Sequence, residues 1–152
     1  MTTTDDVDLR HPAGFSRLLP FGPFAEQVGP LFERVGPGEH VVGMRVQEMH
    51  RNRRQSVHGG MICTLVDTAM ARGCRLVVEA RLGAQDFFFV TTQMSVSFIG
   101  NAAPGEWVEA HTRVLRAGRR LAFADCIVRL GDTVIVQASG QFMVMTAETS
   151  AR

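Results

Sequence analysis

The amino-acid sequence predicts an α+β fold in which one long helix lies across an antiparallel sheet. A single helical pattern, from about residue 61 to residue 80, is followed by four stretches with strand patterns. Short Gly-bearing turns separate these stretches, and consecutive strands joined by short turns pair antiparallel. One helix covering one face of such a sheet gives the α+β class.

Shorter elements are expected before the helix. Residues 24–28 suit a single helical turn, which Gly29-Pro30 ends. Residues 31–35 and 40–49 suit two strands, because apolar and polar side chains alternate along the second of them. After the helix, the strands are expected at residues 87–99, 107–116, 121–130 and 133–145.

The length of 152 residues fits a single domain with a substantial core. Residues 1–30 are predicted to form an N-terminal arm, residues 31–147 the main domain and residues 148–152 a tail. Because one helix leaves apolar segments such as residues 87–89 uncovered, a second subunit is expected to complete the burial.

Composition excludes several classes of function. The formal net charge is +1, which favours neither nucleic acid nor anionic lipid as a partner, and no apolar run has the length of a membrane span. The acidic N-terminus lacks the apolar segment of a signal peptide. The three cysteines show no CxxC spacing, which argues against a disulfide framework or a zinc site and favours the reducing cytoplasm. No Gly-rich phosphate loop supports nucleotide hydrolysis or hydride transfer.

Asp67 departs from the pattern of the predicted helix. The charged positions Arg72, Arg75 and Glu79 share one stripe, and Asp67 lies roughly 110° from its centre. The neighbours three, four and seven positions away are uncharged: Cys63, Thr64, Met70, Ala71 and Cys74. The residues predicted for the buried face are Ile62, Leu65, Val66, Ala69, Gly73, Leu76 and Val77.

A carboxylate without a charged partner, away from the solvent-facing stripe, has two usual outcomes. Either its pKa rises or it receives a dedicated hydrogen bond, and both suit a general base or a nucleophile. Periodicity alone leaves open a simpler interpretation, in which Asp67 is a boundary residue bonded to nearby backbone.

The segment His58-Gly59-Gly60 comes just before the helical pattern. The first turn of a helix has N–H groups without internal partners, and glycine lets another group approach closely. Such an end can stabilise the oxyanion that forms from a thioester carbonyl. A plain turn before the helix is the alternative.

Several strings together resemble the PaaI-type branch of hotdog-fold thioesterases. Asn52 stands six residues before His58-Gly59-Gly60, and Asp67 stands nine residues after His58. Residues 91–98, 103–106 and 116–120 resemble the family's central strand, a turn and a hairpin, so that the similarity runs from about residue 31 to residue 145. Gln55 departs from the family, in which many members have glycine.

The resemblance implies a hotdog fold, with a curved sheet around the helix, and a dimer that pairs again into a tetramer. It also implies active sites at the subunit interface, with Asn52, His58 and Gly59 from one chain and Asp67 and Thr91 from its partner. By this analogy the Gly59 amide polarises the thioester carbonyl, Asp67 attacks it or activates water, and Thr91 orients the acid or the water. Asn52 and His58 help to position this network. His58 as a loop-fixing residue and Thr91 as a plain strand residue stay open.

The implied substrate is an acyl-CoA, and no metal or separate cofactor is needed because CoA belongs to the substrate. All sixteen basic residues are arginine, which binds phosphate bidentately. The residues expected to contact CoA are Gly60, Arg54, Arg116, Arg119 and Arg120. A solvated charged surface is the alternative for the arginines. The acyl group stays open between phenylacetyl-type, other aryl and medium-chain acyl groups.

Two other functions fit a hotdog fold. One is an acyl-thioester dehydratase or hydratase, in which a histidine and an acid move a proton on and off carbon. The other is a binding module for acyl-CoA without turnover. The spacing from His58 to Asp67 favours hydrolysis over the first, and the complete set of Asn52, His58, Gly59 and Asp67 argues against the second.

Overall fold

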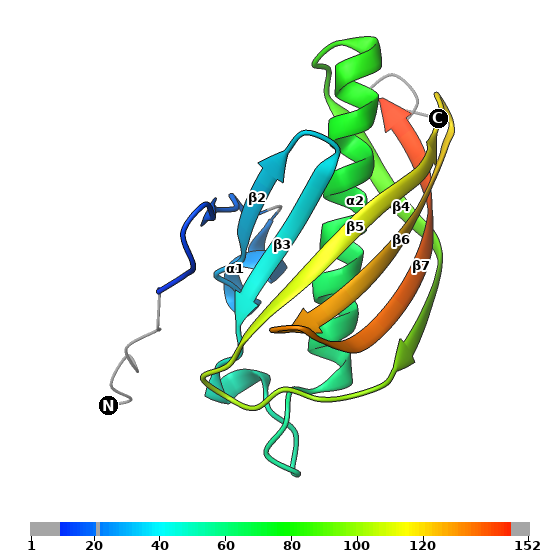
Figure 1. The fold of residues 1–152 in the computed structure, drawn as a ribbon. Helices are drawn as coiled ribbons and strands as arrows, with labels where there is room; N and C mark the ends of the chain where they lie inside the picture. The colour runs from blue at the N-terminus through cyan, green and yellow to red at the C-terminus, as the bar shows by residue number, and fades with distance from the viewer. Residues whose placement is uncertain (1–9, 21, 147–152) are drawn as a thin grey trace.

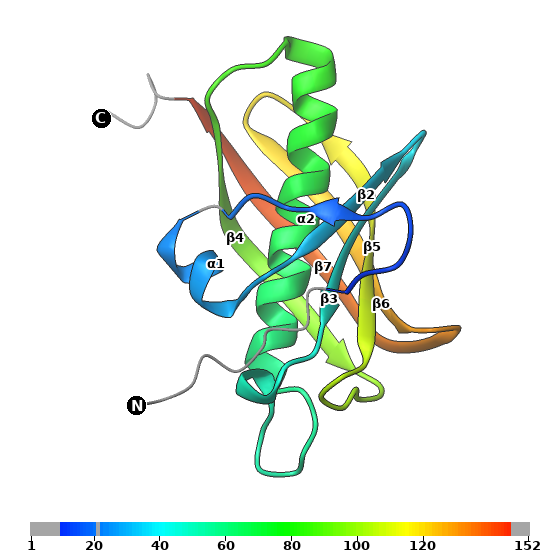
Figure 2. The same ribbon diagram turned by 90° about the vertical axis from the view of Figure 1, so that its left-hand side faces the viewer.

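The computed structural model describes residues 10–20 and 22–146, and within them seven strands form one antiparallel sheet. The sheet curves around the long helix α2, Gly59–Leu82 (Figures 1 and 2). The strand order is β1-β2-β3-β5-β6-β7-β4. This arrangement confirms the predicted α+β class.

The helix and the four long strands that follow it lie close to their predicted positions. The strands are β1 Ser16–Arg17, β2 Phe32–Gly36, β3 Glu39–Arg45, β4 Phe87–Phe98, β5 Trp107–Ala117, β6 Leu121–Leu130 and β7 Thr133–Thr146, and the shorter helical segments are α1 Pro23–Val28 and η1 Glu48–His50. The predicted tail at 148–152 and the first nine residues of the predicted arm lie outside the described residues. No helix in the described ranges is both long and apolar enough to cross a bilayer.

The two-residue strand β1 was not predicted. It pairs with β2 at the edge of the sheet, and the flanking residues Phe15 and Leu18 are buried. Phe15 packs with Phe32 and Trp107 on the face of β3 that points away from α2. A strand of two residues has no periodicity to detect, so only its pairing reveals it.

The buried face of α2 differs from the predicted one at its C-terminal half. Leu76 and Val77 are only half-buried, whereas Met70, Cys74 and Val78 are fully buried. The reason is that Leu76 and Val77 line a groove beside β2 and β3, although Val77 also packs against the edge of the core. Toward the N-terminal end, Ile62, Leu65, Val66 and Ala69 are buried as predicted.

β4 is an edge strand, because it pairs with β7 on one side and with no other strand of the described chain on the other. The prediction of an uncovered apolar segment at 87–89 is wrong for Phe87, which is buried in its own chain. It holds for Phe88, which is 53% exposed, and Val90 beside it is 47% exposed. Large apolar side chains on an open edge favour pairing with another chain.

We expect Gly43→Ala to destabilise the fold, because the new Cβ would lie 2.1 Å from the Trp107 ring. Overpacking of this kind costs about 1–3 kcal/mol of the free energy of unfolding. Gly36→Ala is the matched control on the next strand, since its Cβ would meet only the Glu39 side chain at 3.8 Å. Equal unfolding midpoints in urea for the two variants would contradict the close approach of Trp107.

Candidate active site

Asp67 is half-buried on α2 and faces β4. Its Oδ1 accepts a hydrogen bond of 2.6 Å from the Thr91 hydroxyl. In the described part of the chain no cation forms an ion pair with this carboxylate, and Oδ2 has no hydrogen-bond partner. The dedicated hydrogen bond expected for Asp67 is therefore present, and one oxygen stays available to a water or a substrate.

A β-bulge in β4 aims Thr91 at the helix. The pairing with β7 shifts between Thr91 and Gln93, and the extra residue Thr92 donates its hydroxyl to the Gln141 carbonyl at 3.1 Å. Before the bulge, Phe87, Phe89 and Thr91 face α2; after it, Met94 and Val96 pack against the core. Bulges commonly re-aim side chains beside active sites. Without this one, strict alternation would turn either Thr91 or Met94 away from the helix.

His58 caps the N-terminus of α2. Its Nδ1 accepts a hydrogen bond of 2.9 Å from the Gly60 N–H, and its carbonyl accepts from the N–H groups of Met61 and Ile62. A side chain at position 60 would meet the imidazole, since its Cβ would lie 3.0 Å from Nδ1. Gly60 therefore leaves room for the cap, and the His58 ring holds the first turn of α2.

Gly59 keeps a free amide. Of the first four N–H groups of α2, the Gly59 N–H is the one without a partner among the described residues. The absent Cβ of Gly59 would lie 3.3 Å from the Phe98 ring, at the end of β4. The cap thus satisfies three donors and leaves the first one directed outward from a positive helix end.

Asn52 builds the loop that leads to Gly59. Its Oδ1 accepts the Arg54 N–H at 2.8 Å, and its Nδ2 donates to the Ser56 hydroxyl at 3.1 Å. Gln55 has a φ of 62°, a conformation that glycine adopts at no steric cost. This positive φ is a physical reason why many family members have glycine at this position.

One chain does not bring Gly59 and Asp67 together. They lie eight residues apart on α2, which corresponds to about 12 Å along the helix axis. The structure therefore groups Asp67 with Thr91 at the middle of α2, and Asn52, His58 and Gly59 at its N-terminus. A single thioester carbonyl cannot contact both groups within one chain.

A groove of about 390 Å³ opens beside Asp67, between α2 and the first half of β4. Phe87, Phe88, Phe89 and Val90 form one wall. The sequence interpretation placed Arg72 and Arg75 on the solvent-facing stripe and missed that they line this groove. Their spacing from Asp67 on the helix does not indicate a shared groove, because the opposite wall of the groove comes from β4.

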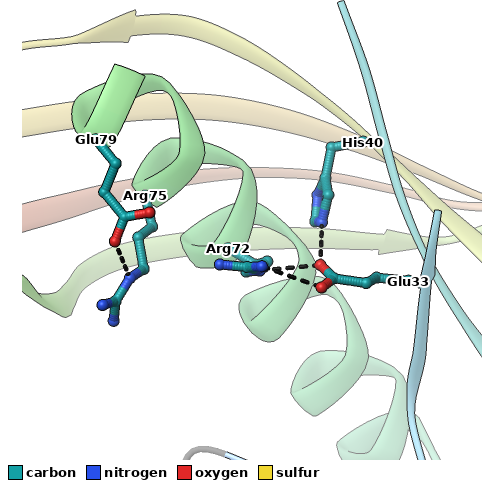
Figure 3. Close-up of polar contacts among 5 residues, drawn as sticks. All are labelled: Glu33, His40, Arg72, Arg75 and Glu79. Atoms are coloured by element: carbon teal, nitrogen blue, oxygen red, sulfur yellow. Dashed lines mark hydrogen bonds and ion pairs between the residues drawn. The ribbon is translucent and has the colours of Figure 1, made fainter. Parts of the chain in front are cut away.

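Both arginines of the groove are held by carboxylates (Figure 3). Glu33 on β2 accepts two hydrogen bonds from Arg72, at 2.9 and 3.0 Å, and this pairing lowers the pKa of Glu33 although burial opposes it. Arg75 donates to Glu79 at 2.6 Å. The positive charge of the groove wall is thus largely balanced.

The predicted CoA-binding arginines lie at two ends of the molecule. Arg116, Arg119 and Arg120 are exposed at the β5–β6 turn, beside the C-terminal end of α2, where Arg81 bonds the Ala117 carbonyl. Arg54 is exposed in the loop at the N-terminal end of α2. Figure 1 shows the turn and the loop at opposite ends of the helix. The sequence did not show this separation.

The two buried cysteines are not suited to act as thiolate nucleophiles. Cys74 and Cys126 are free, and burial raises the pKa of each thiol to about 12. Within the described ranges no three His, Cys, Asp or Glu residues form a group that could hold a metal ion. Among the residues that line the groove, Asp67 supplies the carboxylate.

We expect the protein to lose stability as the pH falls below about 6.5, in part through His50. His50 lies at the base of the site loop: its Nδ1 accepts the Gln47 N–H, its Nε2 donates to the Val28 carbonyl, and its carbonyl accepts the His58 N–H. Burial lowers the pKa of His50 below its ordinary value of 6.5, against the Val28 bond, which raises it. The unfolded chain then takes up the proton first, so stability is full above 6.5 and declines below it.

The measurement is urea unfolding at about pH 7.5 and about pH 5.5. His50→Gln offers an acceptor and a donor but does not titrate, and it should lose less stability between the two values than the unchanged protein. Burial also lowers the pKa of His40, so the variant should still lose some stability at the lower pH. The same decline in both proteins would show that His50 is not linked to folding.

Residues 55–139 match the family model described as the thioesterase superfamily. The Pseudomonas aeruginosa protein PA0474 is 34% identical over 132 residues, covering 86% of this chain and 95% of its own. Mouse acyl-coenzyme A thioesterase 13 is 28% identical over 105 residues, covering 63% of this chain and 71% of its own.

Solved structures agree with the fold. The conserved protein PA5202 from Pseudomonas aeruginosa superposes with a TM-score of 0.70 at 30% identity, covering 82% of this chain and 95% of its own. A point mutant of the phenylacetic acid degradation protein PaaI from Thermus thermophilus gives 0.65 at 25% identity, covering 80% and 98%. The predicted PaaI-type resemblance and the hotdog fold are confirmed. This chain is a thioester hydrolase that belongs to the thioesterase superfamily.

Proposed function

We propose that this enzyme hydrolyses acyl-CoA thioesters at sites formed by two copies of the chain. The observation that carries the proposal is the pair of half-sites on one helix, about 12 Å apart along the axis. One half holds an acid with a free oxygen, and the other holds an amide with a free hydrogen. The mouse relative's name, acyl-coenzyme A thioesterase 13, supports this substrate class.

In the proposed dimer, the open edge of β4 pairs with β4 of a second copy and continues the sheet. The burial of Phe88 and Val90, which are about half exposed in one chain, favours this contact. The pairing brings the α2 N-terminus of one copy toward Asp67 and Thr91 of the other. The further step to a dimer of dimers, and the cytoplasmic location, stay predictions.

The proposed chemistry uses Gly59 and Asp67 on opposite sides of the thioester carbonyl. The Gly59 N–H donates to the carbonyl oxygen and stabilises the negative charge that develops there. Asp67 acts through Oδ2, as the base that takes a proton from the attacking water or as the nucleophile itself, while Thr91 holds Oδ1. His58 and Asn52 are positioning residues, because they shape the loop that presents Gly59.

The proposed CoA contacts also come from two chains. Arg54 and Gly60 lie beside Gly59, whereas Arg116, Arg119 and Arg120 lie near the far end of α2. We assign the first group to the copy that supplies Gly59 and the second to the copy that supplies Asp67. No separate cofactor is proposed.

Hydrolysis is favoured over hydration of an enoyl thioester by the state of His58. To take a proton from carbon, a histidine needs a ring nitrogen with a free lone pair. In His58 the lone pair of Nδ1 accepts the Gly60 N–H, and Nε2 carries the ring hydrogen. A binding module without turnover would not need the free oxygen of Asp67. The three functions are separated by incubating the protein with acyl-CoA and with enoyl-CoA. Release of free thiol indicates hydrolysis, loss of the double bond indicates hydration, and neither change indicates binding without turnover.

Asp67→Asn should reduce thioester cleavage about 10²- to 10⁴-fold, because the amide keeps the shape but cannot act as base or nucleophile. The matched control is Asp125→Asn, which removes an exposed carboxylate bonded to Arg113 on the outer face of the sheet. The release of free thiol from a panel of acyl-CoA substrates measures both variants and also ranks the acyl groups. Full turnover in Asp67→Asn would remove Asp67 from the mechanism.

Gly59→Pro should reduce kcat about 10²- to 10³-fold, because proline has no N–H to donate to the oxyanion. Proline is well tolerated at the first helical position, and His58 already has the extended φ of −67° and ψ of 135° that precede proline. Gly59→Ala is the control, since it adds a Cβ near Phe98 but keeps the amide. Equal kcat values for the two variants would contradict the oxyanion role.

The same two variants test whether each active site is formed by two chains. Co-expressed chains that carry Asp67→Asn and Gly59→Pro form mixed dimers, in which one site carries both defects and the other neither. Random assembly should then restore about a quarter of the activity of the unchanged enzyme. Mixtures as inactive as the separate variants would place the whole site within one chain.

A further inference from the structure

Each half-site of the chain meets β4 at one residue. At the middle of α2, the Thr91 hydroxyl donates to Asp67 at 2.6 Å. At the N-terminus of α2, the Phe98 ring lies 3.3 Å from where a Cβ of Gly59 would be. Both Thr91 and Phe98 are on the face of β4 toward the helix, because the β7 residues paired with them are buried in the core. The distance along β4 between these two residues therefore restricts how two copies can share a site.

The backbone of β4 shows which residues face its open edge. Ile99, directly after the strand, donates its N–H to the Ile135 carbonyl of β7 at 2.9 Å. Alternate residues along an antiparallel strand direct their N–H and C=O groups to opposite sides. Beyond the bulge, the odd-numbered residues therefore bond to β7, and the residues whose backbone groups point to the open edge are Met94, Val96 and Phe98.

One register of β4 against β4 of a second copy brings the half-sites together. Residues opposite each other in an antiparallel pair point to the same face of the sheet. Counted from Ser95, and passing over the bulged Thr92, three steps in the two directions lead to Phe98 and to Thr91. A two-fold axis at Ser95 thus sets Phe98 of one copy opposite Thr91 of the other. An axis one residue away would separate the two by about 7 Å along the strands.

The side chains on the outer face of β4 agree with this register. The axis at Ser95 sets Gln93 opposite Ser97, and Val90 opposite Ile99. Polar residues then face polar ones, and the two apolar side chains, which are 47% and 62% exposed in one chain, cover each other. An axis shifted by one or two residues in either direction would place Val90 or Ile99 opposite a polar side chain.

We propose that two copies pair through β4 with the two-fold axis at Ser95, and that Phe98 is a positioning residue of the active site. Opposite residues of a pair have Cβ atoms about 5 Å apart, so the Phe98 ring reaches Thr91 of the second copy. The ring, which is 55% exposed in one chain, then packs between the Gly59 end of its own helix and the residue that holds the acid. Its role in hydrolysis rests on the proposed function, whereas the register does not depend on catalysis.

A disulfide across the axis tests the register. Since Ser95 bonds to β7, its two copies form a non-hydrogen-bonded pair with Cα atoms about 4.5 Å apart, a separation that a disulfide spans. Ser95→Cys should therefore be linked as a dimer by mild oxidation, as seen on a gel without reductant. Cys63→Ser is made in the same chain, because Cys63 is the free cysteine that is not buried.

Gln93→Cys and Ser97→Cys are the matched controls on the same face of the strand. Each lies about 13 Å from its own copy in this register, too far for a disulfide, and neither should link alone. The two changes in one chain should link, because Gln93 lies opposite Ser97. Linkage of either control alone, or of none of the variants, would overturn the register. This result is independent of whether the protein hydrolyses acyl-CoA.

The linked Ser95→Cys dimer then tests the role of Phe98 without any loss of assembly. This dimer should keep its turnover, measured without reductant by the loss of thioester absorbance. Turnover that disappears on linkage and returns on reduction would show that this register does not assemble the site.

In the linked dimer, Phe98→Ala should lower kcat about tenfold or more with a smaller change in KM, because the two halves of the site lose their spacer. Phe98→Leu should restore part of kcat. Ile99→Ala is the control, since it removes an equally exposed apolar side chain on the outer face of the sheet. Equal kcat values for Phe98→Ala and Ile99→Ala would overturn the positioning role.

Discussion

The rigidity of α2 is the constraint on which the rest of the structure depends. A hydrogen-bonded helix fixes the separation of its residues, so Gly59 and Asp67 stay about 12 Å apart along the axis whatever the loops do. The proposed chemistry nevertheless places Gly59 and Asp67 on the two sides of one carbonyl. The proposed assembly follows from this mismatch, because only a second helix can supply the missing group.

The edge strand β4 holds the residues of the sheet that lie beside Asp67 and Gly59. Its bulge at Thr91–Gln93 lets the strand hold Asp67 through Thr91 and still pack Met94 and Val96 on the core. The same strand ends at Phe98, whose ring would lie 3.3 Å from a Cβ at position 59. β4 thus touches both half-sites of its own chain and presents an open edge to a second chain. The strand that positions the acid is also the strand that favours assembly.

Sequence reasoning reached most of the fold because its long elements have clear periodicity. The helix and the four strands after it extend over ten or more residues each, and their turns carry glycine. Asp67 was found because a carboxylate stood outside a charged stripe. Thr91 lies 24 residues away and was assigned through the family resemblance, since no local pattern relates the two. The bond between them depends on which strand lies beside the helix.

The features that were missed depend on contacts between distant segments. Glu33 and Arg72 are 39 residues apart, and neither pattern predicts that β2 would lie over the helix. Leu76 and Val77 look as apolar as their neighbours, but the sheet does not extend over them. The role of His58 as a cap was open because a histidine before a helix suits a ligand as well as a cap. The cap itself is visible only in the structure, as the 2.9 Å bond that the Gly60 N–H donates to Nδ1.

The pairing of charges around the Asp67 groove leaves this carboxylate without a cationic partner among the described residues, as the proposed chemistry requires. Arg72 and Arg75 both line this groove, and each is a cation that a carboxylate within reach can bind. Glu33 and Glu79 occupy them instead. Asp67 is left with a neutral hydroxyl on one oxygen, so that its second oxygen is not taken by a cation. In the proposed mechanism the Glu33–Arg72 pair therefore supports the site, because it occupies an arginine of the groove wall without contacting Asp67.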